Sequence, residues 1–164
     1  MSTPAKSKAE DVKAELAQLA RDAKSPQDLM GRMVKLLHQR LLKYNWVGFY
    51  MMDHQPGQPP MLALGDFQGA MTPHTRIPLH QGICGAAAST GKTVVVDDVH
   101  QDPRYLACSL ETKSEIVVPV FAHGKVVGEL DIDSHFAAAF KDEDRALVEY
   151  CASLVGSSLE ASHK

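Results

Sequence analysis

The sequence constrains its fold most strongly where two strand-like runs are separated by a tight turn. Residues 115–122 and 125–132 are rich in β-branched residues, and only His123-Gly124, a dipeptide typical of short hairpin loops, stands between them. Residues 45–52 and 61–64 form a second such pair, separated by a segment rich in proline and glycine. Strands joined as hairpins are antiparallel, so the sequence predicts a mainly antiparallel sheet.

Helical patterns flank these strands. Apolar residues at i, i+4 and i+7 predict a helix over residues 7–22. A second helix is expected to begin at Ser25-Pro26, because serine caps helices and proline suits the first helical position. The last helix begins near Lys141, with three acidic residues in its first turn, and carries Cys151 on its apolar stripe. The predicted class is α/β (α+β), with helices packed against an antiparallel sheet.

Length and composition narrow the functional classes. The 164 residues fit one domain, with residues 1–43 forming N-terminal helices and residues 44–164 forming the sheet, the site loops and the closing helix. The net charge is −3 and Lys and Arg do not cluster, which argues against nucleic acid or an anionic membrane as a partner. No apolar run approaches the roughly 18 residues of a membrane span, and no signal peptide is recognisable. We therefore expect a cytoplasmic protein.

The three cysteines have different surroundings. Cys108 lies in a polar segment where a loop is expected, and loops often carry reactive groups, although a small buried side chain is the alternative. Cys84 follows Gly82 and Ile83 at a predicted helix start, where N–H groups and the helix dipole favour a thiolate or hold a substrate carboxylate. Packing among alanines is the alternative for Cys84. Cys151 is expected to be packed.

Three acidic residues are expected to lie near one another on the second hairpin. Asp131 and Asp133 are two residues apart on a predicted strand, so their side chains leave on one face, and Glu115 opens the partner strand. Crowded carboxylates raise the pKa of at least one of them, and a protonated acid can donate a proton to a leaving oxygen. Alternatively, Asp131 and Asp133 face solvent while Leu130 and Ile132 are buried.

Other site types have weaker support. Eight histidines are present, but none has metal-ligand spacing and no Cys-x-x-Cys occurs, so no metal site is expected. Glycine-rich phosphate or dinucleotide motifs are also missing. Trp46 and Tyr50 are four residues apart and share one strand face, where they either pack in the core or wall a pocket for a small apolar group.

Seven short motifs in a fixed order resemble one known family. They are NWVGFY at 45–50, LGDFQG at 64–69, GICGAAA at 82–88, DVH at 98–100, ACS at 107–109, SEIVVP at 114–119 and LDIDS at 130–134. This series is similar to the free methionine-(R)-sulfoxide reductases, enzymes built on a GAF domain. The resemblance extends from Asn45 to the closing helix, and it implies a six-stranded antiparallel sheet flanked by helices and a homodimer.

The resemblance also implies residue roles. Cys108 matches the catalytic cysteine, which attacks the sulfur of free methionine sulfoxide and becomes a sulfenic acid. A set of three acids matches those that hold the sulfoxide oxygen and the substrate ammonium: Glu115, Asp131 and Asp133. Trp46 and Tyr50 match the aromatic residues around the substrate methyl group. No bound cofactor is implied.

Recycling of the sulfenic acid is the step at which the sequence departs from the family. The family commonly carries a cysteine shortly after the Phe-Gln-Gly motif, and residues 70–75 contain none here. Cys84 is then the intramolecular partner, giving a disulfide that a thioredoxin-like protein reduces, and glutathione or another external thiol is the alternative. A ligand-binding GAF module and a thiol redox sensor are the other functional classes, but Cys108 together with the acids favours the enzyme.

Overall fold

The computed structural model describes residues 8–106 and 111–162. Six strands in this part of the chain form one sheet in the order β3-β2-β1-β6-β5-β4, and every neighbouring pair is antiparallel. The strands are β1 (Trp46–Asp53), β2 (Met61–Gln68), β3 (Arg76–Pro78), β4 (Val94–Val96), β5 (Ser114–Ala122) and β6 (Lys125–Ser134). The helices are α1 (Lys8–Asp22), α2 (Pro26–Arg40), α3 (Gly82–Thr90), α4 (Asp142–Ser162) and the short 3-10 helix η1 (Val99–Gln101). The predicted fold class is confirmed.

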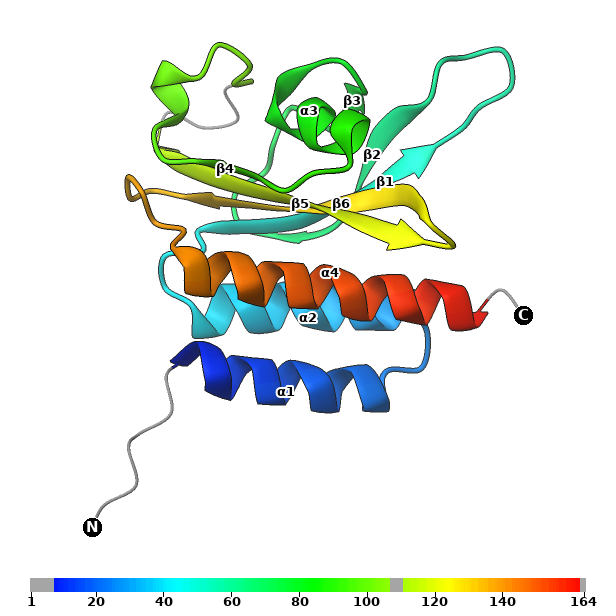
Figure 1. The fold of residues 1–164 in the computed structure, drawn as a ribbon, viewed down its shortest axis with the longest axis vertical. Helices are drawn as coiled ribbons and strands as arrows, with labels where there is room; N and C mark the ends of the chain where they lie inside the picture. The colour runs from blue at the N-terminus through cyan, green and yellow to red at the C-terminus, as the bar shows by residue number, and fades with distance from the viewer. Residues whose placement is uncertain (1–7, 107–110, 163–164) are drawn as a thin grey trace.

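Helices cover both faces of the sheet (Figure 1). Helices α2 and α4 pack on one face with α1 outside them, and α3 lies on the other face. Side chains alternate accordingly along β1, because successive strand residues point to opposite faces. Val47 and Phe49 belong to the core beneath α2 and α4, whereas Trp46 and Tyr50 belong to the core beneath α3. The larger core carries the helical layer, and the smaller one supports the candidate site.

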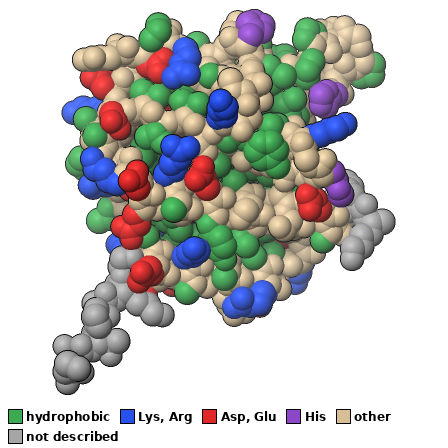
Figure 2. Space-filling model, in the orientation of Figure 1, with side chains coloured by type: hydrophobic (Ala, Val, Ile, Leu, Met, Phe, Trp, Pro, Cys, Tyr) green, Lys and Arg blue, Asp and Glu red, His purple; other side chains and the backbone are tan. Residues whose placement is uncertain are grey.

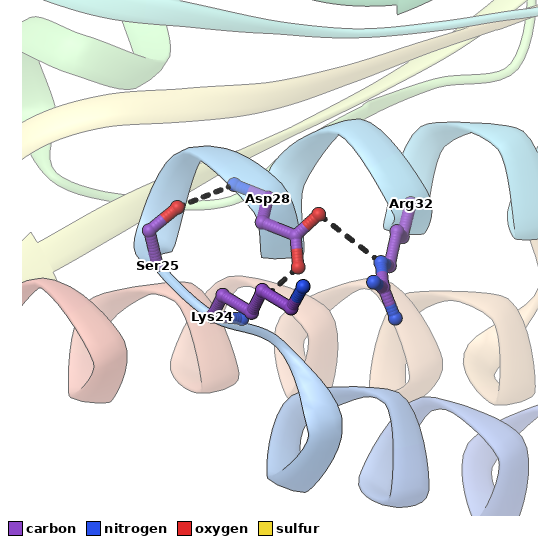
Figure 3. A network of polar contacts seen from close by, with 4 residues as sticks. All are labelled: Lys24, Ser25, Asp28 and Arg32. Atoms are coloured by element: carbon purple, nitrogen blue, oxygen red, sulfur yellow. Dashed lines mark hydrogen bonds and ion pairs between the residues drawn. The ribbon is translucent and has the colours of Figure 1, made fainter.

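The start of α2 is capped as its sequence predicts (Figure 3). The Ser25 hydroxyl accepts a hydrogen bond from the Asp28 backbone N–H at 3.0 Å, and Pro26 occupies the first helical position. The Asp28 carboxylate accepts from the Lys24 backbone N–H at 3.0 Å and from the Arg32 side chain at 3.1 Å. These contacts satisfy N–H groups that lack intrahelical acceptors and fix the α1–α2 connection.

The β5–β6 turn also follows its sequence prediction. His123 and Gly124 both have positive φ angles, 52° and 75°, as a two-residue hairpin turn of this kind requires. Strand β2 is longer than expected and continues to Gln68, although Gly65 and Asp66 are poor strand formers. Gly65 and Asp66 lie at a bulge in the β1–β2 ladder, and the pairing of Phe67 and Gln68 with Gly48 and Val47 beyond it continues the strand despite the local preference.

The surface carries charges of both signs. On the face drawn in Figure 2, Lys and Arg side chains are interspersed with Asp and Glu side chains. Exposed ion pairs such as Arg145–Glu149 contribute little to stability, because water and salt screen them. No helix in residues 8–106 and 111–162 is long and apolar enough to cross a bilayer.

Helix α4 approaches the edge of the β5–β6 hairpin so closely that one position requires glycine. A Cβ atom at Gly156 would overlap the backbone carbonyl oxygen of Phe121, and backbone cannot move aside as a flexible side chain can. Gly31 in α2 is different, because the nearest atoms to an added Cβ would be those of the Asp66 carboxylate, starting at 3.7 Å.

We therefore predict opposite effects for two helical glycines. Gly156→Ala should lower the free energy of unfolding by about 2 kcal/mol or more, because the helix must shift away from the sheet. Gly31→Ala is the matched control and should raise it by about 0.5–1 kcal/mol, because alanine has the better helix propensity. Urea unfolding followed by circular dichroism measures both values, and equal effects of the two substitutions would contradict this packing account.

Candidate active site

Four carboxyl groups gather on the sheet face beneath α3. Glu115 comes from β5, and Glu129, Asp131 and Asp133 are alternate residues of β6, so all four point to the same side. Glu115 pairs directly with Asp133 across the two strands. All four residues are at most 6% exposed, so the alternative in which Asp131 and Asp133 face solvent is wrong. We call these four residues the acid cluster.

Strand β1 places aromatic side chains beside the acid cluster. Trp46 lies opposite Asp133 in the β1–β6 ladder, and Tyr50 lies opposite Glu129. The two rings stack with their centroids 6.2 Å apart. Gly48 lies between them, and a Cβ atom there would overlap the indole ring of Trp46. Glycine at this position therefore lets the indole lie across the strand.

Hydrogen bonds hold both aromatic residues in place. The Trp46 indole N–H donates to the carbonyl oxygen of Ala70 at 3.0 Å, and the Tyr50 hydroxyl donates to the carbonyl oxygen of His74 at 2.7 Å. Phe67 also stacks on Trp46, with 5.6 Å between ring centroids. The segment after β2 therefore positions the aromatic wall of the site.

The N-terminal turn of α3 covers the acid cluster from above. Gly82 has a φ of 71°, and a Cβ atom there would lie 2.9 Å from the Leu106 side chain, so both the backbone and the packing favour glycine. Ile83 and Cys84 are buried. The Cys84 thiol lies within hydrogen-bonding distance of Asp131, with Sγ 3.5 Å from Oδ2.

Two cavities adjoin the acid cluster. The smaller, about 10 Å³, is lined by residues that include Tyr50, Cys84, Glu115 and Asp131. The larger, about 90 Å³, is lined by residues that include Trp46, Thr112, Asp133 and His135. Tyr50 and Trp46, the aromatic residues predicted to belong to the site, therefore each line a cavity together with at least one of the acids predicted from the sequence.

Cys108 belongs to residues 107–110, which lie outside the described residues. Its predicted loop position and reactivity therefore stay predictions. The described residues on either side of this segment take part in the site, since Leu106 lines the smaller cavity and Glu111 lines the larger one.

Burial raises the pKa of every carboxyl in the cluster. Loss of solvation is the largest cause for Glu115, and the neighbouring Asp131 and Asp133 raise its pKa further. Burial likewise raises the pKa values of Glu129 and Asp133 well above their ordinary range. The pKa of Asp131 is also raised by burial, but hydrogen bonds from Glu115, Cys84 and Asp133 oppose the shift. Asp131 is therefore the member best suited to carry charge.

Of the alternatives open for Cys84, packing agrees with its burial, whereas a thiolate is disfavoured. Burial raises the pKa of this thiol well above its ordinary value, and Asp131, Glu129 and Glu115 add to the shift by disfavouring a second negative charge. Cys84 therefore combines packing in the α3 core with a polar contact to Asp131.

Glu129 is a site residue that the sequence reasoning missed. It is fully buried, and neither of its carboxyl oxygens has a hydrogen-bond partner among the described residues. The alternation Glu129, Asp131, Asp133 was the available signal, because every second residue of a strand shares a face. Cys151 is also buried, but it lies in the core beneath α4, on the opposite face of the sheet.

The cluster also contains groups that are spaced as metal ligands are. One ligand atom each from Cys84, Glu115 and Asp131 lies within 4.8 Å of the others. These residues come from α3, β5 and β6, so no local sequence pattern could reveal the arrangement.

Comparisons with known proteins agree with this architecture. The GAF domain family model matches residues 25–159. The chain is 38% identical to the free methionine-R-sulfoxide reductase of Escherichia coli, in an alignment that covers 66% of this chain. It is 42% identical to the free methionine-R-sulfoxide reductase of Saccharomyces cerevisiae, in an alignment that covers 70% of this chain. These alignments span 62% of the length of each of the two relatives.

A solved structure extends the match over nearly the whole chain. The free methionine-R-sulfoxide reductase from Neisseria meningitidis, determined in complex with its substrate, superposes with a TM-score of 0.87 at 34% identity. The superposition covers 99% of this chain and 96% of that one. The chain therefore belongs to the GAF domain family and, within it, to the free methionine-R-sulfoxide reductases, which are oxidoreductases. The resemblance inferred from the seven motifs is confirmed.

We predict that Glu129→Gln makes the fold more stable than the wild type, and that this difference in stability grows as pH rises. A carboxyl whose pKa is raised in the folded state contributes no instability below its ordinary pKa of 4.5, and it destabilises the fold as pH rises toward the raised value. Glutamine does not ionise, so it avoids this destabilisation. The free energy of unfolding of the variant should exceed that of the wild type by about 1.4 kcal/mol for each pH unit between the ordinary pKa and the raised pKa of Glu129.

Thermal unfolding between pH 4 and pH 8 measures this effect. The difference in Tm between variant and wild type should be small at pH 4 and should grow to several degrees at pH 8. Glu143→Gln, at an exposed position in the first turn of α4, should show no such growth. A constant difference for Glu129→Gln across the range would show that Glu129 titrates normally.

Proposed function

We propose that this chain reduces free L-methionine-(R)-sulfoxide to methionine, with Cys108 as nucleophile and the acid cluster as proton donor and ammonium site. The observation that carries the proposal is the buried cluster of Glu115, Asp131 and Asp133, in which burial raises the pKa values of Glu115 and Asp133 well above their ordinary range and so favours their protonated forms. The named relatives support the choice of substrate.

Chain connectivity supports the assignment of Cys108. It is two residues from Leu106, and two residues of extended chain span at most about 7 Å. Leu106 shares the smaller cavity with Glu115 and Asp131. We infer from this closeness along the chain that Cys108 supplies the thiol that attacks a sulfoxide held by those acids.

The first half-reaction transfers oxygen from substrate to enzyme. The Cys108 thiol gives up its proton and its sulfur attacks the sulfoxide sulfur, while a protonated acid of the cluster donates a proton to the sulfoxide oxygen. The protonated oxygen then passes from the substrate sulfur to Cys108 Sγ as the bond between the two sulfur atoms breaks, so methionine leaves and Cys108 becomes a sulfenic acid. The proton released by the thiol restores the acid of the cluster. The substrate gains two electrons and the cysteine loses two.

The remaining groups orient the substrate. Asp131, whose neighbours oppose the rise in its pKa, is the carboxylate assigned to the substrate ammonium. Backbone N–H groups at Gly82 and Ile83 begin α3, where they lack intrahelical acceptors, and are assigned to the substrate carboxylate. Trp46 and Tyr50 are assigned to the methyl group, which fits their apolar ring faces.

Recycling requires a second thiol. We assign this role to Cys84, which would condense with the sulfenic acid to release water and form a disulfide for a thioredoxin-like protein to reduce. The raised pKa of Cys84 makes it a weak nucleophile, so Asp131, its hydrogen-bond acceptor, would take the proton. We further propose a cytoplasmic homodimer that works without a bound cofactor.

The first test is turnover of the separate sulfoxide epimers. Methionine production with dithiothreitol should be seen for the R epimer of free methionine sulfoxide and not for the S epimer. Cys108→Ser should lower kcat by about 10³-fold or more, because its hydroxyl is a poor nucleophile without a strong base. Tight binding of the R epimer without turnover by the wild type would instead indicate a ligand-binding module.

The second test separates the two recycling routes. Cys84→Ser should keep activity with dithiothreitol and lose most of its NADPH consumption with thioredoxin and thioredoxin reductase. Cys151→Ser is the matched control, because Cys151 is equally buried but lies on the other face of the sheet, and it should behave as the wild type. Full thioredoxin-linked turnover by Cys84→Ser would assign recycling to an external thiol.

A further inference from the structure

The small cavity beneath α3 has the size and the lining of a single-ion site. Its volume of about 10 Å³ corresponds to roughly one water-sized sphere. Cys84, Glu115 and Asp131 line it, and their ligand atoms lie within 4.8 Å of one another. We propose that these three side chains bind a thiophilic divalent cation of the Zn²⁺ class.

Unpartnered oxygens around the cavity support a cationic occupant. Asp131 Oδ1 and both carboxyl oxygens of Glu129 are buried and have no hydrogen-bond partner among the described residues. Asp131 is 3% exposed and Glu129 is 0% exposed, so neither carboxyl gains much from solvent. Glu129 also lies close enough to Cys84 and Asp131 for the three groups to influence one another. A cation would compensate this concentration of acidic groups.

The chemistry of the ligands selects the class of metal. Zn²⁺ and Cd²⁺ accept a thiolate together with carboxylates, whereas Mg²⁺ and Ca²⁺ require six or more oxygen ligands. Three protein ligands with a fourth position left for a small molecule is a common arrangement for Zn²⁺. Binding displaces the Cys84 proton and any protons on Glu115 and Asp131, so affinity should rise with pH.

The cation site overlaps the site proposed for the substrate. Competition between Zn²⁺ and methionine sulfoxide follows because Glu115 and Asp131 would serve both, and this consequence rests on the proposed function. Metal binding itself does not rest on it, since it requires only the three side chains and the cavity.

Cd²⁺ titration of the purified, reduced full chain tests the proposal. A cadmium–thiolate bond gives an ultraviolet charge-transfer band, which should saturate at one Cd²⁺ per chain. The band should be absent in Cys84→Ser and retained in both Cys108→Ser and Cys151→Ser. Zn²⁺ should displace the Cd²⁺, and Mg²⁺ in large excess should not.

Two isosteric variants keep the test decisive if Cys84→Ser does not fold. Asp131→Asn, which removes a ligand but keeps the thiol, should weaken binding by about tenfold or more. Glu129→Gln, which changes a neighbour of Cys84, should weaken it by about tenfold. Wild-type affinity in both variants, a band that persists in folded Cys84→Ser, or a band lost only in Cys108→Ser would overturn the proposal.

Activity measurements separate this inference from the proposed function. A chain that turns over the R epimer but binds no Cd²⁺ overturns the metal site alone. A chain that binds Cd²⁺ through Cys84 but never turns over the sulfoxide contradicts the proposed function and leaves the metal site standing. Cd²⁺ binding that is unaffected by saturating substrate contradicts only the shared use of Glu115 and Asp131.

Discussion

Burial of the acid cluster is the constraint on which the rest of the site depends. Charged carboxylates are costly to remove from water, and four of them beside one another cannot all ionise cheaply. Burial accordingly raises the pKa values of Glu115, Glu129 and Asp133, which favours their neutral forms, and the Cys84 thiol lies within hydrogen-bonding distance of Asp131. The proposed reaction releases oxygen from sulfur and requires a protonated acid in a cavity of restricted access. The burial that destabilises the fold therefore also provides the proton donor for the proposed chemistry.

The architecture separates stability from chemistry. Helices α1, α2 and α4 bury an apolar core against one face of the sheet (Figure 1), and none of the described residues assigned to the site belongs to that core. The opposite face combines apolar residues with the acid cluster and lies beneath the short helix α3. Because strand residues alternate between faces, β6 serves both functions, with Leu130 and Ile132 in one core and Asp131 and Asp133 in the other.

Features determined by local chemistry were predictable from the sequence. The Ser25 cap and the His123-Gly124 turn depend on neighbouring residues, and the common face of Asp131 and Asp133 follows from strand periodicity. Features that depend on the docking of distant elements were not predictable. Pairing of Phe67 and Gln68 with β1 extended β2 past Gly65 and Asp66, and the position of α3 over β6 brought the Cys84 thiol beside Asp131, where burial raises its pKa. Glu129 was missed because its burial becomes visible only when α3 covers it.

The central claim is that Glu115, Glu129 and Asp133 of the acid cluster keep their protons to higher pH than ordinary carboxyl groups do. Carbon-13 NMR of side-chain carboxyl groups, followed from pH 3 to pH 9, measures this directly for individual residues. We predict that Glu115, Glu129 and Asp133 titrate well above the ordinary range of carboxyl groups, and that substrate shifts the signals of Glu115 and Asp133. Ordinary titration of every carboxyl, with all of them ionised by pH 6, would contradict it.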